Sequence, residues 1–375
     1  MRIERACYTS ETYKDEPENI VQKIKNMNTL LNFSKGLELI STTTSWYLSD
    51  LAEYRGKQEL YTHQAPQKLK SLKEHAIIES SISSNRMEGV EIEQKRIGTV
   101  VFGKSHHYRD RNEEEIAGYR KALTLIHENS NDILLSDETI KKIHSLTRGE
   151  IWDAGIYKEK DGDIIEKYAD GRERIRFKTV PAKQTSSAME ELLKLWHELI
   201  KEKQVPPLVL LAAYNLDFLC IHPFRDGNGR VSRLLLLLQS YHLGFEVGRY
   251  ISLEKIIEEN KERYYETLEQ SSQGWHEGKH DPWPFINYLL SIFKTAYKEF
   301  ETRVGQVQSP KGAKTESIKL AVEKQIGKFS IAKLQKACPG SSIDMIRKVL
   351  KDLKKEGKVE CLGRGKEASW KKVIR

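Results

Sequence analysis

The sequence lacks the features that mark secreted, disulfide-rich or membrane-spanning proteins. Its four cysteines are scattered without a Cys-x-x-Cys pair, which excludes a disulfide framework and a cysteine-based zinc site. The longest aliphatic runs, 208–213 and 234–238, are far shorter than the roughly 20 residues of a transmembrane helix. The first residues also lack the apolar stretch of a secretory signal. We therefore expect a cytoplasmic protein with no membrane segment.

The composition is that of a folded protein with more than one domain. Hydrophobic residues make up 38% of the chain and charged residues 31%, which argues against wholesale disorder. A length of 375 residues is enough for two or three domains.

The net charge of +8 is unevenly distributed along the chain. Residues 311–375 contain 18 Lys and Arg against 7 Asp and Glu, a net charge of +11, so residues 1–310 have a net charge of −3. A basic surface limited to one segment indicates a local binding property rather than a general one. The sequence therefore predicts a nearly neutral body followed by a basic C-terminal unit.

Hydrophobic periodicity predicts a body that is almost entirely helical. Ser136 and Asp137 are candidate helix caps. Within 161–180, two Asp-Gly turns and an alternating polar and apolar stretch predict one small β-hairpin. Helices are expected over 67–87, 113–126, 137–146, 188–201, 208–220, 230–242, 253–271 and 284–303.

One stretch, 222–233, concentrates residues that bind phosphates. It reads His-Pro-Phe-Arg-Asp-Gly-Asn-Gly-Arg-Val-Ser-Arg and lies between two apolar segments. Gly227 and Gly229 flank Asn228 and permit a turn whose backbone N–H groups converge at the start of a helix, as phosphate oxygens require. Arg230 and Arg233 lie three residues apart on the first turn of that helix and can hold further phosphate oxygens.

Two further side chains in this stretch are suited to catalysis. Asp226 offers the hard oxygen ligand that a phosphate-bound Mg²⁺ uses. His222 has an ordinary pKa near neutrality, as a general base for a hydroxyl group requires. Taken singly, Gly-Asn-Gly is usually a turn and a lone histidine is usually a core or capping residue. Their combination within twelve residues predicts a functional site.

These residues resemble the signature of the Fic family, His-Pro-Phe-x-(Asp/Glu)-Gly-Asn-Gly-Arg-x-x-Arg. Every specified position is matched, and Arg225 stands at a variable one. The resemblance extends over most of residues 65–300, including 143–144 and 155–157. It implies a nucleotidyltransferase that moves AMP from ATP to a Ser, Thr or Tyr hydroxyl of a target protein, or of the chain itself.

The resemblance also implies a role for each residue of the motif. His222 deprotonates the target hydroxyl, and Asp226 holds Mg²⁺. In-line attack at the α-phosphorus mainly requires positioning and charge neutralisation. The phosphates are bound by Gly227, Asn228 and Gly229 at the α- and β-positions and by Arg230 and Arg233 toward the β/γ end.

Two further segments resemble parts of Fic proteins. The hairpin expected within 161–180 is similar to the family's flap, which pairs with an extended target segment by strand addition, although its sequence matches poorly. Tyr264 and Tyr265 resemble a tyrosine pair near the adenine pocket, and we favour Tyr265. Two aromatic side chains packed in the core are the alternative for this pair.

A short segment at the end of the helix expected over 67–87 resembles the family's inhibitory motif, (Ser/Thr)-x-x-x-Glu-(Gly/Asn). Ser84, Glu88 and Gly89 occupy its specified positions. A glutamate at a helix C-terminus opposes the helix dipole, which indicates a partner elsewhere. By the resemblance, Glu88 belongs to the nucleotide site and pairs with Arg233, withholding that arginine from the γ-phosphate.

The C-terminal 65 residues resemble a winged helix-turn-helix domain. Three short helices are expected, followed by a two-stranded wing at 358–362 and 368–373. In such domains the third helix enters the major groove of DNA and the wing touches the backbone. Such domains also bind proteins, and both readings stay open. The candidate DNA contacts are Arg347, Lys348 and Lys351 on the helix and Arg364 and Lys366 in the wing.

The resulting fold class is mainly α: a Fic helical core with a small β-hairpin flap and a C-terminal winged-helix domain. We expect an N-terminal helical region at 1–105 that includes the inhibitory helix at about 67–88, a catalytic core at 106–303, a linker at 304–314 and the winged-helix domain at 315–375.

The sequence leaves several functions open. An autoinhibited adenylyltransferase is the first hypothesis, and a DNA-binding regulator that senses ATP is the second. A bifunctional enzyme that also removes AMP, and transfer of another phosphate-linked group, are further alternatives, because the loop recognises phosphates and not the base. The target, and whether the chain forms a homodimer, are not specified.

Overall fold

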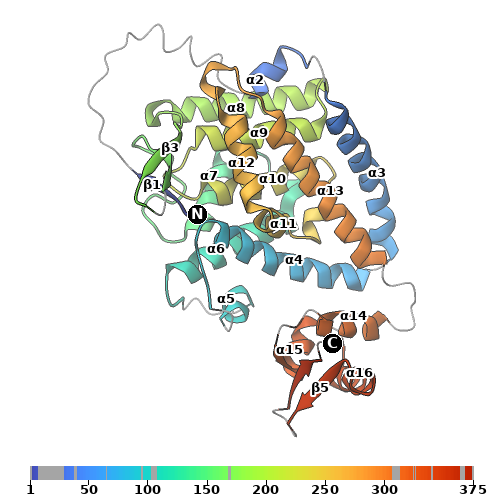
Figure 1. Cartoon of the computed structure of the whole chain (residues 1–375). Helices are drawn as coiled ribbons and strands as arrows, with labels where there is room; N and C mark the ends of the chain where they lie inside the picture. The colour runs from blue at the N-terminus through green and yellow to red at the C-terminus, as the bar shows by residue number, and fades with distance from the viewer. Residues whose placement is uncertain are drawn as a thin grey trace, which may run out of the picture. The chain divides into compact units, whose positions relative to one another are not determined.

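The structure is a computed structural model of the chain, and it is mainly helical (Figure 1). It divides into two compact units, one formed by residues 1–64 and 72–300 and the other by residues 65–71 and 301–375. The residues that it describes are 2–6, 29–37, 40–64, 66–93, 96–102, 108–167, 170–305, 313–323, 325, 327–338, 341–363 and 368–373.

The described helices and strands as far as residue 305 follow the expected order, with additions at the N-terminus. They are β1 (Arg2–Ala6), α2 (Thr29–Ser34), α3 (Thr42–Gln64), α4 (Pro66–Met87), α5 (Ile97–Phe102), α6 (Arg111–Asn129), α7 (Asp137–Arg148), β2 (Asp163–Lys167), β3 (Glu173–Phe177), α8 (Ala182–Glu202), α9 (Pro207–Ile221), α10 (Asn228–His242), α11 (Leu253–Glu259), α12 (Lys261–Ser272) and α13 (Trp283–Gly305).

Helices α9 and α10 form the centre of the larger unit (Figure 1). Every residue of α9 from Leu208 to Ile221 is buried, as its apolar sequence on all faces predicts. Helix α9 contacts α2, α8, α10 and α12, and α10 also contacts α6 and α7. The motif, which spans the short connection between α9 and α10 and the first turns of α10, is therefore held by two buried helices.

The prediction of a single helix over 253–271 is wrong. The chain forms α11 and α12 instead, separated at Asn260, where φ is −122° and ψ is 36°. The Asn260 side chain donates to Ile256 O at 2.9 Å. An asparagine that bonds nearby backbone in this way competes with the helical hydrogen bonds, which explains the break.

The hairpin expected within 161–180 is present as β2 and β3, but it belongs to a three-stranded antiparallel sheet. The order is β1-β2-β3, with β1 paired to β2 from Arg2 opposite Lys167 to Ala6 opposite Asp163. Strand β1 was not predicted, because its partner lies about 160 residues further along the chain. The expectation of a lone hairpin in an all-helical body is therefore corrected.

The smaller unit has its own hydrophobic core. Ser330 and Ser342 cap α15 and α16 through side-chain oxygens that accept from Lys333 N and Met345 N. Strand β4 was not expected, so the sheet has three strands, in the order β4-β6-β5, and not two. The elements are α14 (Ala313–Glu323), β4 (Lys328–Ser330), α15 (Ile331–Ala337), α16 (Ile343–Lys355), β5 (Val359–Leu362) and β6 (Ser369–Lys372), and buried core residues include Ile318, Phe329, Leu334, Ile346, Leu350 and Trp370.

A search of the described residues for a helix with the length and apolar character of a membrane span finds none.

A buried carboxylate joins α9 to the N-terminal helix α2. Asp217 accepts hydrogen bonds from Thr29 N at 2.8 Å, Thr29 Oγ1 at 2.6 Å, Leu30 N at 3.0 Å and Trp275 Nε1 at 2.7 Å. Burial raises the pKa of Asp217 to about 6, although these donors favour the charged form. The carboxylate satisfies donors at the start of α2 that would otherwise be buried without a partner.

We expect Asp217→Ala to lower the free energy of unfolding by about 2–4 kcal/mol, because several buried donors lose their acceptor. Urea unfolding followed by far-UV circular dichroism measures this change. Glu198→Ala, at an exposed position of α8, is the control and should change stability little. Equal stability of the two variants would contradict the role assigned to Asp217.

Candidate functional site

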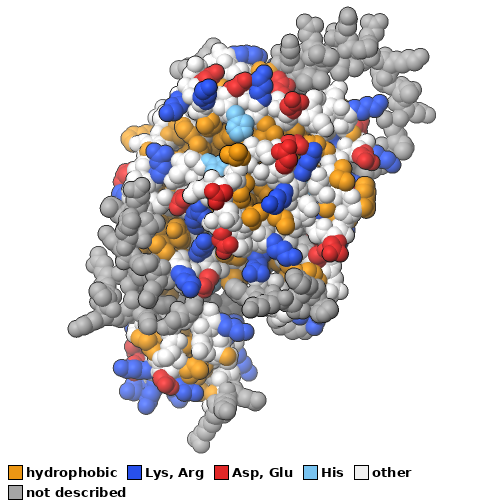
Figure 2. Space-filling view, turned by 180° about the vertical axis from the view of Figure 1, so that it is seen from behind, with side chains coloured by type: hydrophobic (Ala, Val, Ile, Leu, Met, Phe, Trp, Pro, Cys, Tyr) orange, Lys and Arg blue, Asp and Glu red, His pale blue; other side chains and the backbone are white. Residues whose placement is uncertain are grey.

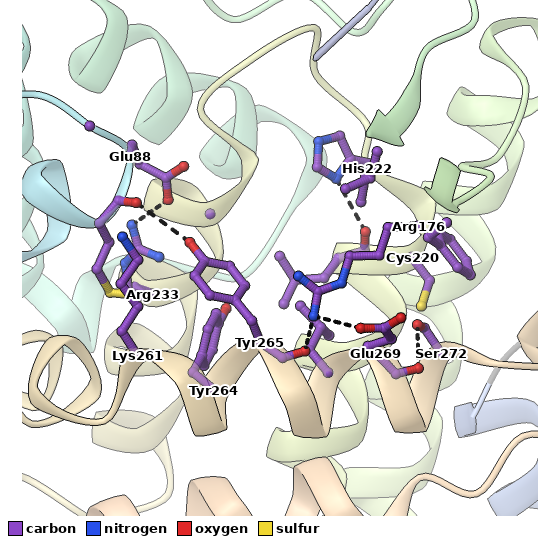
Figure 3. Close-up of a pocket in the computed structure, with 17 residues that line it drawn as sticks. Glu88, Arg176, Cys220, His222, Arg233, Lys261, Tyr264, Tyr265, Glu269 and Ser272 are labelled. Carbon is purple, nitrogen blue, oxygen red and sulfur yellow. Dashed lines mark hydrogen bonds and ion pairs between the residues drawn. The ribbon is translucent and has the colours of Figure 1, made fainter. Parts of the chain in front are cut away.

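A cavity of about 250 Å³ opens beside the connection between α9 and α10 (Figure 3). Its walls come from the end of α4, the β2–β3 hairpin, the end of α9, the start of α10 and one face of α12. Some of the residues singled out from the sequence meet here, whereas Ser84, Asp226, Asn228 and Arg230 do not line the cavity. The predicted residues that line the cavity are Glu88, Gly89, His222, Gly229, Arg233 and Tyr265.

His222 directly follows α9 and has a strained backbone. Its φ of 53° and ψ of 61° lie in the left-handed region, while its N–H donates to Phe218 O and ends the helix. Non-glycine residues in this region are uncommon and cluster at functional sites. The Nδ1 atom lies 3.3 Å from Leu219 O. Because a carbonyl only accepts, Nδ1 carries the proton in this contact, and Nε2 is the basic nitrogen of the neutral ring.

Lys158 tethers the chain on both sides of His222. Its backbone N–H donates to Pro223 O at 2.8 Å, and its buried Nζ donates to Ile221 O at 3.1 Å and to Thr179 Oγ1 at 2.7 Å. These bonds connect the motif to the base of the hairpin. Sequence reasoning missed Lys158, since a lone lysine after a glycine-tyrosine turn carries no such signal.

The Asn228 side chain closes the loop and does not face the cavity. Its Oδ1 accepts from Phe224 N at 2.9 Å, its Nδ2 donates to Phe224 O at 2.7 Å, and the residue is 2% exposed. Gly227, with φ of 81°, stands before α10, and no side chain caps this helix within the described residues. The N–H groups of the first turn of α10 are therefore the part of the motif suited to an anion.

His144 supports the loop from α7. Its ring stacks on Phe224 with a centroid distance of 3.7 Å and an interplanar angle of 5°. Gly155 N donates to Nδ1 at 2.8 Å, so Nε2 carries the proton and donates to Asp226 O at 3.0 Å. Burial lowers the pKa of His144 to about 4, and the ring is therefore neutral at pH 7.

Asp226 lies at the edge of the site with an accessible carboxylate. Oδ2 accepts from Arg148 Nη1 at 2.8 Å, Oδ1 accepts from Gly227 N at 2.6 Å, and the side chain is 56% exposed. Among the described residues, no three His, Cys, Asp or Glu side chains group as a metal cage would. One exposed carboxylate fits Mg²⁺ that is otherwise bound by waters and substrate phosphates.

Arg230 does not reach the cavity. Its guanidinium is almost fully buried, and Nη1 donates to Glu115 Oε2 at 2.7 Å and to Asn85 Oδ1 at 3.1 Å. Glu115 Oε1 also accepts from Arg148 at 2.8 Å. Glu115 thus links Arg148, which bonds Asp226, to Arg230, which bonds Asn85 on α4. The expected contact between Arg230 and the terminal phosphates has no support, because the guanidinium is turned away from the cavity. Glu115 was not predicted, because it lies in a run of three glutamates.

Glu88 and Arg233 form an ion pair at the start of α10 (Figure 3). Arg233 Nη2 lies 2.8 Å from Glu88 Oε1 and 2.9 Å from Ser84 O, and its Nε donates to Ser84 Oγ at 2.8 Å. Burial alone would lower the pKa of Arg233, but the charge and hydrogen bond of Glu88, together with Tyr264 and Tyr119, outweigh burial, and the pKa stands above its usual value. A Cβ at Gly229 would clash with Glu88 Oε1, so this carboxylate would have to shift if another residue replaced the glycine.

The last two turns of α4 bury mainly polar side chains. Ser80 donates to Glu254 Oε2 at 2.7 Å, Ser84 accepts from Arg233, and Asn85 accepts from Arg230. Gly89, with φ of 79°, follows the helix. The buried side chains of these turns include Ser80, Ser81, Ser83, Ser84 and Asn85.

The two tyrosines of α12 differ in position. Tyr264 is buried beneath the cavity at 3% exposure, and only part of Tyr265 is buried. Tyr265 Oη lies 3.5 Å from Met87 O, and burial raises its pKa well above the ordinary value. Arg176, from β3, lies with its Cζ 5.7 Å from the centre of the Tyr265 ring. Both tyrosines line the cavity, and Tyr265 forms its floor between α4 and the hairpin.

Residues 134–240 match the model of the Fic/DOC family. The chain contains a Fic/DOC domain. This interval includes α7, the hairpin, α8, α9 and the motif, whereas α4 and α12, which complete the cavity, lie outside it. Members of the Fic/DOC family transfer AMP or other nucleotide-derived groups to proteins and use nucleoside triphosphates, usually with a metal ion.

Solved structures of Fic proteins share this fold. A Fic family protein from Desulfovibrio desulfuricans G20 is 19% identical, with a TM-score of 0.55, over 90% of this chain and 98% of that one. A Fic domain containing signaling protein from Bacteroides thetaiotaomicron VPI-5482 is 20% identical, with a TM-score of 0.56, over 68% of this chain and 97% of that one. Fic-1 from C. elegans is 18% identical, with a TM-score of 0.53, over 69% of this chain and 72% of that one.

The neutral state of His144 makes the stability of the Fic/DOC domain depend on pH. Its pKa is lower when folded than when unfolded, so this stability is present above about pH 6.5 and is lost as the pH falls toward 4. Between pH 7 and pH 5 we expect His144 to account for about 2 kcal/mol of the loss. Urea unfolding at both pH values should therefore show a weaker pH dependence for His144→Gln. An unchanged dependence would contradict the buried neutral ring.

Proposed function

We propose that this chain is a protein adenylyltransferase whose own α4 inhibits it. The observation that carries the proposal is the Glu88 carboxylate, bonded to Arg233 at the uncapped start of α10 in the cavity that His222 lines. A helix start without a cap and a buried arginine form a site for an anion. In the resting chain a carboxylate of the protein occupies that site.

The reaction follows from the positions of the side chains. The target hydroxyl oxygen attacks the α-phosphorus of ATP, its proton passes to His222 Nε2, and the bond between the α-phosphorus and the oxygen of the departing pyrophosphate breaks. The N–H groups at the start of α10 stabilise charge on the phosphates. Asp226 is the residue that would hold Mg²⁺, which neutralises phosphate charge when bound. Lys158 and Asn228 keep His222 and the loop in place.

The inhibition rests on competition for one arginine. A carboxylate and a phosphate oxygen both take charge-assisted hydrogen bonds from a guanidinium in similar geometry. While Glu88 holds Arg233, the γ-phosphate of ATP lacks this partner, and the nucleotide is bound without correct alignment. Ser84, which bonds the same guanidinium, fixes Arg233 in the position where Glu88 meets it.

We expect Glu88→Gly to raise AMP transfer by roughly tenfold or more, since without this carboxylate the Arg233 guanidinium can bind the γ-phosphate. We expect His222→Ala to reduce transfer by about 10²–10⁴-fold, the range of general-base catalysis. Radiolabelled ATP with Mg²⁺, added to cell lysate or to the protein alone, measures both. Equal labelling by the wild type and the Glu88 variant would exclude the inhibition.

Mass spectrometry separates the remaining hypotheses for this site. An AMP adduct on a target or on the chain supports transfer, and its loss on further incubation supports a bifunctional enzyme. A different phosphate-linked adduct indicates another donor. ATP that stays intact throughout supports a sensor and not a transferase.

A second function is supported by the C-terminal unit, which we propose is a winged-helix domain that binds DNA. The outer face of α16 is basic: Arg347, Lys348 and Lys351 are exposed, whereas Ile346, Val349 and Leu350 face the core. Figure 2 shows Lys and Arg side chains on the surface of this unit. The two wing residues predicted to contact DNA, Arg364 and Lys366, lie outside the described residues. The lysines and the arginine contribute salt-dependent binding to phosphates.

Binding to a mixed-sequence DNA duplex, measured by fluorescence anisotropy between 50 and 200 mM salt, tests this function. We expect a Kd that rises steeply with salt, and a slope reduced by about two for the Lys348→Ala, Lys351→Ala double variant. Lys298→Ala, a single change outside this unit, should keep the wild-type slope. Absence of binding at the lowest salt concentration would exclude DNA as the partner.

A further inference from the structure

Three polar side chains at the end of α4 form a line, here called the polar row. Ser80, Ser84 and Glu88 follow one another at intervals of four residues, which places them on the same side of a helix. Ser84 and Glu88 both bond to Arg233, as described above. Ser80, two turns before Glu88, bonds to α11, which lies beside α4 (Figure 1). The polar row therefore connects the carboxylate at the anion site to a second helix of the larger unit.

The partner of Ser80 is Glu254, a buried carboxylate near the start of α11. Its Oε2 accepts from Ser80 Oγ at 2.7 Å, and its Oε1 accepts from Tyr119 Oη, on α6, at 2.8 Å. Ser252, which caps α11, has its Oγ 2.9 Å from Ser80 Oγ. Glu254 is only 1% exposed. Because a buried carboxylate has lost the water that stabilised its charge, the hydroxyl groups around it have to replace that water.

The other contacts between the end of α4 and α11 are more exposed to solvent. Arg86 Nη1 lies 2.9 Å from Glu258 Oε1, and the Arg86 side chain is 54% exposed. Lys255 Nζ lies 2.8 Å from Glu79 Oε1, and the Lys255 side chain is 35% exposed. Water screens such ion pairs, so they contribute little to holding two helices together. The contact of Ser80 with Glu254 is therefore the stronger attachment of α4 to α11.

We propose that Glu254 is a positioning residue for the inhibition, which holds α4 at Ser80 and so keeps Glu88 within reach of Arg233. This inference rests on the proposed inhibition by α4. Tyr119 fixes the carboxylate from α6, so Glu254 cannot follow α4 when the helix shifts. A shift that withdraws Glu88 also removes one donor from a carboxylate that stays buried, and this cost opposes the shift. The strength of the inhibition is thus set outside the cavity.

Comparison of two backgrounds tests this role. AMP transfer to proteins of a cell lysate, with radiolabelled ATP and Mg²⁺, is measured for the wild type, Glu254→Ala, Glu88→Gly and the double variant. We expect Glu254→Ala to raise transfer roughly three- to tenfold in the wild-type background, as the loss of a buried hydrogen bond predicts. In the Glu88→Gly background it should leave transfer unchanged, because no carboxylate is left to position. A residue with a merely structural role would instead lower transfer equally in both backgrounds.

Two further variants separate positioning from loss of folding. Ser80→Ala removes the hydroxyl from the other side of the contact and should also raise transfer in the wild-type background. Glu254→Gln should restore wild-type inhibition, because its amide oxygen still accepts from the two hydroxyl groups. Glu259→Ala is the matched control: Glu259 is exposed on the same helix, and its removal should leave transfer at the wild-type level. Thermal unfolding shows whether each variant is folded.

Amide hydrogen exchange of residues 80–88, followed by mass spectrometry, reports on the helix without requiring catalysis. We expect faster exchange in Glu254→Ala and Ser80→Ala than in the wild type and Glu259→Ala, since the end of α4 is held less firmly. Unchanged exchange, or an equal loss of transfer in both backgrounds, would overturn the role of Glu254 while the inhibition by Glu88 stands. If Glu88→Gly itself does not raise transfer, the proposed inhibition is overturned, and this role with it.

Discussion

The arrangement of the whole site depends on the pair of hydrogen bonds between the Asn228 side chain and the backbone of Phe224. They close the connection between two buried helices into one shape. With the loop closed, His222 is held in a strained left-handed conformation, and Gly229 in the first turn of α10 lines the cavity. The loop therefore has little conformational freedom of its own.

The parts that could be predicted from sequence are those set by neighbours along the chain. The caps at Ser136, Ser330 and Ser342, the hairpin and most helices follow from local periodicity and from side chains that bond nearby N–H groups. The motif was identifiable for the same reason, because its residues follow one another in the connection between α9 and α10 and in the first turns of α10. Glu88 was identifiable only through its resemblance to a known motif.

The parts that could not be predicted depend on contacts between distant segments. Glu115, on α6, and Lys158, in the loop before β2, have no local pattern, yet each contacts the motif. The ion pair of Arg230 with Glu115 was not predicted, because spacing on a helix places Arg230 beside Arg233 but cannot show that Glu115 lies behind it. Strand β1 was missed because a strand of five residues gains its stability from its partner and not from its own sequence.

The buried polar face of α4 determines which groups would become exposed if the contacts of this helix were broken. A helix docked by leucines exposes hydrocarbon when it moves away, and the exposed surface tends to aggregate. The hydroxyl and amide groups of Ser80, Ser84 and Asn85 can instead bond to water as readily as to Glu254 and the two arginines. Breaking the polar contacts of α4 would therefore expose groups that water can hydrate, and not the hydrocarbon of a leucine surface.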